Sequence, residues 1–86
     1  MNNPIKFIVV QAGHCVFGAG STLAEAIADS VEWIDGVNTP AEVEVMLSDS
    51  PNDGDMAAID SDNPEFAEYL RSHGGFSEIN GQWFAD

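Results

Sequence analysis

The sequence predicts an α+β fold made by a single small domain, residues 1–86, in which helices pack against one sheet. A chain of 86 residues has room for one domain with a modest core. Apolar residues make up 44% of it, which is more than acidic disordered chains usually contain. Short β-branched runs alternate with helical periodicity in the order β-β-α-α-β-α-β-β, and one sheet covered by helices buries all their apolar faces. The strand order stays open.

Two strands joined by a tight turn are expected first. Residues 5–10 form a β-branched and aromatic run that is typical of a strand buried on one face or on both. Residues 11–14 supply a turn and residues 15–17 start a returning strand, so we expect a hairpin. Gly18 and Gly20 are expected to break this strand and let the chain enter a helix.

The first helix has a clear start signal. Thr22 and Glu25 have the spacing of a capping box, in which the hydroxyl and the carboxylate each satisfy a free backbone N–H. Gly36 is the expected C-terminal cap. Apolar residues at helical spacing define the stripe that is predicted to be buried: Leu23, Ile27, Val31 and Ile34.

The opposite face of this helix is entirely acidic. Glu25, Asp29 and Glu32 follow one another at helical spacing and are predicted to be exposed. Each pair of like charges on neighbouring turns costs about 0.2–0.5 kcal/mol of helix stability. The cost is small, but a face selected only for helix stability would alternate acids with bases.

A second helix is expected after a similar start signal. Residues 39–42 repeat the capping pattern, with Pro40 at the first helical position, where its missing N–H costs nothing. The helix should run to about Ser48, with its apolar side chains inward: Val43, Met46 and Leu47. The alternative is a strand with Val43, Val45 and Leu47 on one face, and the start signal favours the helix.

A polar loop, a short strand and a third helix follow. Residues 48–54 are rich in turn formers, and residues 56–59 form an apolar run that fits a short interior strand. The third helix should begin at residues 63–64 and end at residues 74–75. Its predicted core face consists of Phe66, Tyr69 and Leu70.

A second hairpin closes the predicted fold. Asn80 and Gly81 are the favoured pair for a type I′ turn, and they stand between apolar runs at residues 76–79 and 82–85. This is the clearest local signal in the chain.

The charge of the chain is the main indication of function. The whole sequence has 15 acidic residues against two basic ones, Lys6 and Arg71, for a net charge of −13. Repulsion among these negative charges opposes the compact state. A folded chain that keeps so many of them is therefore expected to bind a strongly basic partner through its electrostatic field. The charge argues against direct binding to nucleic acid or to an anionic membrane.

We therefore expect a partner-binding acidic surface. Most of its candidates come from the stretch 42–68, which contains nine acidic residues and no Lys or Arg. The candidate residues are Asp49, Asp53, Asp55, Asp60, Asp62, Glu65 and Glu68, together with Glu25, Asp29 and Glu32 of the first helix. A basic nucleic-acid-binding protein or complex is the expected partner.

The loop after residue 48 partly matches an EF-hand calcium loop. Asp49, Asp53, Gly54 and Asp60 fall at positions 1, 5, 6 and 12 of the pattern, but Pro51 at position 3 has no ligating side chain. A strand rather than a helix is predicted after the loop. We interpret it as an acidic surface loop, and expect no metal and no cofactor.

No group of residues predicts catalysis, so we expect a protein that is not an enzyme. His14 and Cys15 are adjacent, and neighbours on a strand point to opposite faces, so a packed cysteine beside a turn histidine is the better interpretation. Trp33, Trp83 and Phe84 are expected to pack in the core or at its rim, because so small a chain needs its aromatic residues there.

The location expected for the chain is the cytoplasm of a bacterial host cell. Cys15 is the only cysteine, so no internal disulfide forms. The apolar run at residues 7–10 is too short for a signal-peptide core or a membrane span.

A small, strongly acidic α/β chain with two basic residues and one cysteine resembles the anti-CRISPR inhibitors of bacteriophages that act on type I surveillance complexes, and the antirestriction DNA mimics. The resemblance covers size, composition and layout over the whole chain and includes no binding motif. It implies a monomer or weak dimer that occupies a positively charged groove of the effector by DNA mimicry, so that target DNA does not load.

A second resemblance concerns the first hairpin. This hairpin and the following residues 20–26 are similar to the entry of the partial ribonuclease-like fold of HicB-type antitoxins, which implies neutralisation of a basic toxin. The DNA-binding tail usual in that family has no counterpart in these residues, which counts against it. An acidic assembly protein of a phage particle is a further alternative.

Overall fold

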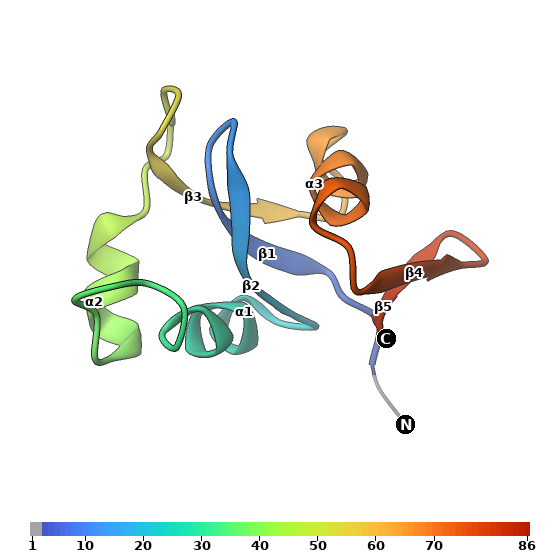
Figure 1. Cartoon of the computed structure of the whole chain (residues 1–86), viewed down its shortest axis with the longest axis horizontal. Coiled ribbons are helices and arrows are strands. Elements are labelled where there is room, and N and C mark those ends of the chain that lie inside the picture. Colours follow the sequence, from blue (N-terminus) through green and yellow to red (C-terminus); the bar gives the residue numbers. More distant parts are fainter. Residues whose placement is uncertain (1–2) are drawn as a thin grey trace.

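The computed structural model describes residues 3–86 and has the predicted α+β class and order of elements (Figure 1). The elements are β1 (Phe7–Gln11), β2 (Cys15–Gly20), α1 (Leu23–Ser30), α2 (Pro40–Met46), β3 (Met56–Asp60), α3 (Glu65–His73), β4 (Phe76–Ile79) and β5 (Gln82–Ala85).

A three-stranded antiparallel sheet with the order β2-β1-β3 lies at the centre of the molecule. Helices α1 and α2 lie on one side of it and α3 lies on the other (Figure 1). Successive side chains of a strand point to opposite faces. Because both faces are covered, the consecutive residues Ile8, Val9 and Val10 of β1 are all fully buried.

The two faces of the sheet carry separate apolar clusters. The cluster under α1 and α2 has as its buried members Val9, Ala26, Ile27 and Val43. The cluster under α3 and the C-terminal hairpin has as its buried members Ile5, Ile8, Val10, Val16, Ala57, Phe66, Leu70 and Trp83. The molecule is therefore built in three layers, with the sheet in the middle.

The strands divide between two sheets, whereas the sequence predicted one. Strands β4 and β5 form a separate two-stranded sheet, and their turn is the predicted type I′, with positive φ at both Asn80 (52°) and Gly81 (80°). The hairpin adds Trp83 to the core instead of extending the central ladder. A single bridge, in which the Ile5 N–H donates to the Trp83 carbonyl at 2.7 Å, joins the two sheets.

Gly18 lies inside β2, so the prediction that it breaks this strand is wrong, whereas Gly20 is the last residue of the strand, as predicted. Both are needed because α1 crosses directly over the strand. A Cβ atom on Gly18 would lie 2.5 Å from the Ala26 carbonyl oxygen, and one on Gly20 would lie 2.6 Å from the Glu25 Cβ. Glycine here allows two backbones to approach closely.

Helix α1 begins as predicted and ends early. The Thr22 hydroxyl accepts the Glu25 N–H at 3.1 Å. The helix stops at Ser30, whose hydroxyl donates to the Ile27 carbonyl at 2.7 Å, and the Trp33 N–H then donates to the Ser30 carbonyl in a tighter turn. Residues 31–36 form turns, so Gly36, with φ of 81°, belongs to these turns and is not the helix cap.

The early end of α1 changes its buried face. Ile27 is 3% exposed, as predicted, but Leu23 is 41% exposed, and Val31 and Ile34 are only half-buried. The side chains against β2 belong to the small residues Ala26 and Ser30, because only these fit the close approach to the strand.

Helix α2 is confirmed against the strand alternative. The Thr39 hydroxyl accepts the Glu42 N–H at 3.4 Å, Pro40 is at the first helical position and Val43 is fully buried. The helix ends at Met46, two residues before the predicted end. Met46 is exposed and Leu47 half-buried, because so short a helix at the margin of the core buries only one turn of one face.

The second half of the chain agrees closely with the prediction. Phe66 and Leu70 of α3 are buried and Tyr69 is half-buried. In the first half of the chain, Cys15 also departs from the prediction, because it is exposed at the start of β2 instead of packed. Helix α1 covers the opposite end of that strand, at Gly18 and Gly20.

Candidate interaction surfaces

Every one of the 15 acidic residues is exposed, including all ten candidates for partner binding. An ionised carboxylate is costly to bury, and almost no basic side chains are present to pair with it. One of the two basic residues is already engaged: Arg71 Nη2 lies 3.5 Å from Glu78 Oε1, and its guanidinium lies over the Trp83 ring. The surface is thus almost purely negative.

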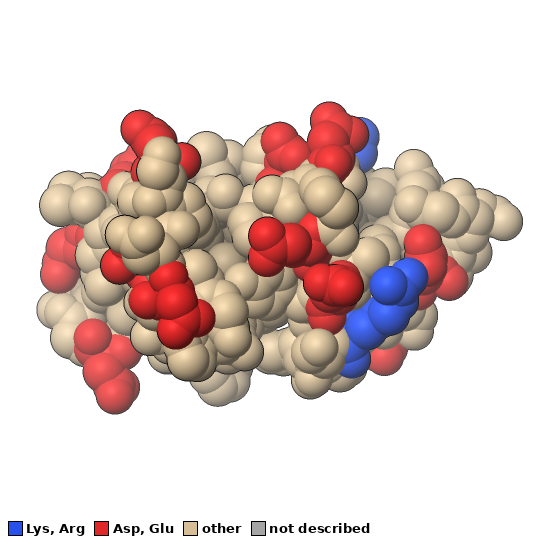
Figure 2. All heavy atoms as spheres, turned by 90° about the horizontal axis from the view of Figure 1, so that it is seen from above, with Lys and Arg blue, Asp and Glu red and all other residues tan. Residues whose placement is uncertain are grey.

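The acidic stretch 42–68 does not form one continuous face. Asp55 directly precedes β3 and Asp60 is its last residue, and a strand of five residues spans about 16 Å. Figure 2 shows the acidic side chains in several separate groups, with other surface between them. The loop acids Asp53 and Asp55 therefore belong to one end of the sheet, and Asp60 and Asp62 belong to the other.

Four candidates gather near the β1–β2 turn, in a group that we call the turn cluster: Asp49, Asp53, Glu65 and Glu68. The first three line a hollow of about 370 Å³. Asp53 Oδ2 lies 3.4 Å from His14 Nε2, and the Gly13 N–H donates to the Tyr69 hydroxyl at 2.7 Å, which ties the turn to α3.

The partial calcium pattern does not converge in space. Asp60, at position 12 of the pattern, is the last residue of β3, whereas Asp49 and Asp53 lie in the loop before this strand. The Asp55 carboxylate accepts the Asn52 N–H at 3.0 Å. Within residues 3–86, no group of three or more His, Cys, Asp or Glu side chains is placed to hold a metal ion.

Asp60 and Asp62 form a turn at the far end of β3, where the Asp60 carboxylate accepts the Asp62 N–H at 3.0 Å. Asp62 lines a hollow of about 360 Å³ together with Lys6 and Glu78. A basic residue therefore lies beside this pair of acids, unlike the turn cluster.

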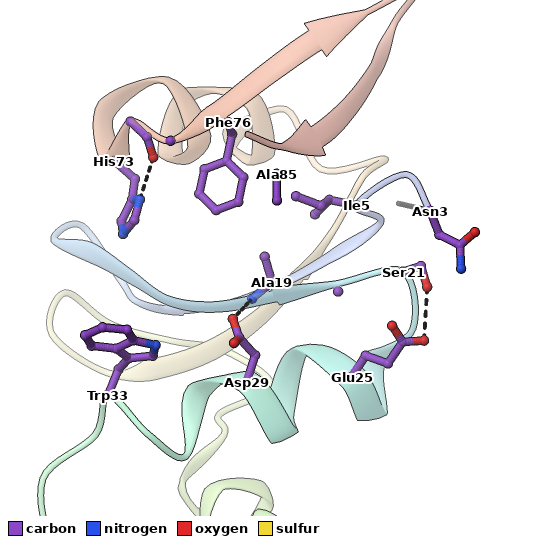
Figure 3. A pocket seen from close by; sticks show the side chains of 13 residues that line it. Asn3, Ile5, Ala19, Ser21, Glu25, Asp29, Trp33, His73, Phe76 and Ala85 are labelled. Carbon is purple, nitrogen blue, oxygen red and sulfur yellow. Dashed lines mark hydrogen bonds between the residues drawn. The ribbon is translucent and has the colours of Figure 1, made fainter. Parts of the chain in front are cut away.

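The acidic face expected on the first helix is divided by the early end of α1. Glu25 and Asp29 lie on the helix, and Glu32 lies in the turns after it. The Glu25 carboxylate accepts the Ser21 hydroxyl at 3.0 Å, and Asp29 Oδ2 accepts the Ala19 N–H at 3.1 Å. Both side chains line a groove beside β2 (Figure 3).

This groove, which we call the edge groove, runs between the α1 layer and the α3 layer. Two adjoining hollows of about 780 and 490 Å³ make it up, and they share five lining residues: Ala19, Asp29, Trp33, His73 and Phe76. In Figure 3, Phe76 points from the α3–β4 side toward Ala19 of β2, while Asp29 and Trp33 come from the α1 side.

Trp33, like Leu23 and Cys15, lies at a more exposed place than the sequence predicted. It is 67% exposed on the wall of the edge groove, whereas Trp83 is buried and Phe84 half-buried, as predicted. The helical spacing suggested that α1 continued past Trp33. The stop at Ser30 turns the indole outward, and no local signal in the sequence marks that stop.

No helix among the described residues is long and apolar enough to cross a membrane. Comparisons of the chain with protein-family models, with curated proteins and with solved structures give no match.

Proposed function

We propose that this protein is a non-enzymatic inhibitor that binds the positively charged nucleic-acid-binding surface of a host defence complex and blocks the loading of target DNA. The observation that carries the proposal is the exposure of all 15 carboxylates on a chain with two basic residues. A surface that binds phosphates by charge attracts such a body, and the attraction speeds association.

The charge density is of the right order for a mimic of DNA. The longest dimension of the protein is 35 Å. Duplex DNA of that length carries about 20 charges, at one per ~1.7 Å of axis. The net charge of −13 is about two thirds of that number. The separate acidic groups resemble phosphates in being spaced over the body instead of packed into one site.

The test uses a purified type I surveillance complex, a labelled target duplex and the protein. DNA loading is followed by mobility shift as the protein is added. Loading should be lost near one protein per complex, and the loss should weaken as salt increases because the charges are screened. Full loading in a large excess of the protein would refute an inhibitor of this complex. The same design with a restriction enzyme tests the antirestriction variant of the proposal.

One observation favours a second candidate, an antitoxin that neutralises a basic toxin. The β1–β2 hairpin leads through a capped turn into α1, which packs across β2 at Gly18 and Gly20. This is the layout on which the resemblance to HicB-type antitoxins rests. Coexpression with a toxin encoded beside the gene should restore growth under this candidate, and the surveillance complex should then be unaffected.

A further inference from the structure

Strand β2 faces the edge groove with its outer side, on which the chain itself satisfies the Ala19 N–H, since this group donates to Asp29 Oδ2 at 3.1 Å. The strand is the outer one of the central sheet and pairs only with β1 within residues 3–86. The opposite edge strand, β3, is partly covered by its own chain, because the Ser48 N–H donates to the Met56 carbonyl at 2.9 Å. An open strand edge presents a row of backbone donors and acceptors with which another chain can pair.

Strand β2 forms the floor of the edge groove, and side chains from the two neighbouring layers form its walls. Four consecutive residues of β2, 16–19, line it, and a strand of four residues is about 13 Å long. Asp29 and Trp33 form one wall, and His73 and Phe76 form the other. An extended peptide has room to lie beside β2 between these walls, at the usual strand spacing of about 4.8 Å.

The chemistry of the walls selects a basic occupant. Glu25 and Asp29 line the groove, and none of its described lining residues is Lys or Arg. The Asp29 carboxylate accepts one backbone N–H, and a carboxylate has about four acceptor positions, so it has capacity for a cation. The exposed indole of Trp33 is the best aromatic face for a cation, particularly for a guanidinium.

We propose that the edge groove receives an extended basic segment of the partner, which pairs with β2 as an added strand and places an Arg or Lys side chain between Asp29 and Trp33. This inference rests on the proposed function, because it names the way in which the basic partner is held. Backbone pairing with an edge strand supplies affinity, and pockets for alternate side chains supply specificity. The other acidic groups then steer the partner, and the groove anchors it.

The direct test uses a peptide of alternating Arg and Val as the probe, followed by amide shifts in NMR spectra of the isotope-labelled protein. The shifts should concentrate on residues 16–19 and on the Trp33 indole N–H. The same Arg-Val peptide with every backbone N–H methylated is the matched control, because it keeps the charge and the side chains and lacks all the backbone N–H donors needed for pairing. Equal binding of both peptides, or shifts spread over all the acidic groups, would overturn the inference.

Two substitutions sharpen the test. Trp33→Ala should weaken binding of the Arg-Val peptide by about fivefold or more, and Asp29→Asn should weaken it while keeping an acceptor for the Ala19 N–H. Val45→Ala truncates another exposed apolar side chain, on α2 and outside the groove, and should leave binding unchanged. Thermal melts check that each variant folds. An unchanged affinity in Trp33→Ala with an intact melt would contradict the anchor role.

The two proposals fail separately. If the surveillance complex is inhibited and Trp33→Ala inhibits it equally well, the groove is not the docking site and the inhibitor function stands. If the Arg-Val peptide occupies the groove and the complex loads DNA normally, the groove serves another basic partner and the proposed function is wrong.

Discussion

At the scale of single residues, the close approach of α1 to β2 decides which side chains are tolerated. Gly18 lies beneath the backbone of Ala26 and Ser30, and backbone atoms do not move aside as a flexible side chain does. The close packing of α1 on β2 therefore requires that residue 18 has no Cβ atom.

Gly18→Ala should therefore destabilise the protein, by about 1–3 kcal/mol, because the added methyl group forces β2 and α1 apart. Ala28→Ser is the control, since it adds one atom at an exposed position of α1 and should change stability by less than about 0.5 kcal/mol. Chemical denaturation of both variants provides the measurement. Equal stabilities would mean that the helix does not approach the strand this closely.

A second pair of variants tests which side of α1 is buried. Ile27→Ala should cost about 2–5 kcal/mol, because it leaves a cavity under the helix. Leu23→Ala should cost about 1 kcal/mol or less, since Leu23 is 41% exposed. Thermal melts distinguish the two, and a larger loss for Leu23→Ala would contradict this orientation of the helix.

Residue-scale prediction from the sequence succeeded where the cause was local. The caps at Thr22 and Thr39 depend on residues three positions away, and both hydroxyls accept the expected N–H. The other half of the capping box at Thr22 is not formed as predicted, because the Glu25 carboxylate accepts the Ser21 and Thr22 hydroxyls. The exposure of Leu23 and Cys15 depends on what lies across the molecule from them, and the sequence of one segment contains no information about that.

At the scale of elements, periodicity predicted all eight helices and strands in order, because each pattern spans several neighbouring residues. The stop of α1 at Ser30 and the separation of the C-terminal hairpin were missed. The stop of α1 depends on hydrogen bonds of Ser30 that compete with the helix, and the separation of the hairpin depends on the docking of Trp83 in the core. Both are outcomes of packing, which overrides local preference.

The loop before β3 provides a test at this scale. Millimolar calcium should leave the melting temperature nearly unchanged, because Asp49 and Asp53 lie before the strand and Asp60 lies at its end. A ligand at a hundredfold excess over its Kd would stabilise the folded state by about 2.7 kcal/mol. A rise of several degrees with calcium and none with magnesium would contradict the surface-loop interpretation.

At the scale of the whole molecule, the exposure of the acids was predictable, because hydration keeps carboxylates at the surface whatever the fold. Their division into groups and the edge groove were not predictable. The groove joins Trp33 and His73, which are some 40 residues apart in the chain. The acids of the stretch 42–68 are close in sequence and are separated by the length of β3.

Self-repulsion predicts that salt stabilises this protein. Raising the ionic strength from 0.01 to 1 M shortens the screening length from about 30 to 3 Å, so the melting temperature should increase. A variant with Glu25→Gln, Asp29→Asn and Glu32→Gln should melt at an equal or higher temperature than the parent at low salt. A melting temperature that falls with salt would mean that the few ion pairs outweigh the repulsion.

The variant with Glu25→Gln, Asp29→Asn and Glu32→Gln also tests whether the negative charge contributes to partner binding. It should lose more affinity for the surveillance complex than either Asp53→Asn with Asp55→Asn or Asp60→Asn with Asp62→Asn, because it alone alters the edge groove. Ser50→Ala, Ser61→Ala and Ser72→Ala together are the control, as three exposed changes without loss of charge. If all three acidic sets bind like the parent, the charge serves only solvation.

The outer edge of β2 pairs with no further strand in residues 3–86, so it is also a place where two copies of the chain can join, strand against strand, into dimers and longer aggregates. At neutral pH, two bodies of charge −13 repel each other and keep such edges apart. Near the isoelectric point of about 4.1 this protection vanishes. The solubility of the protein should therefore decrease on acidification, and the aggregates should begin at strand β2.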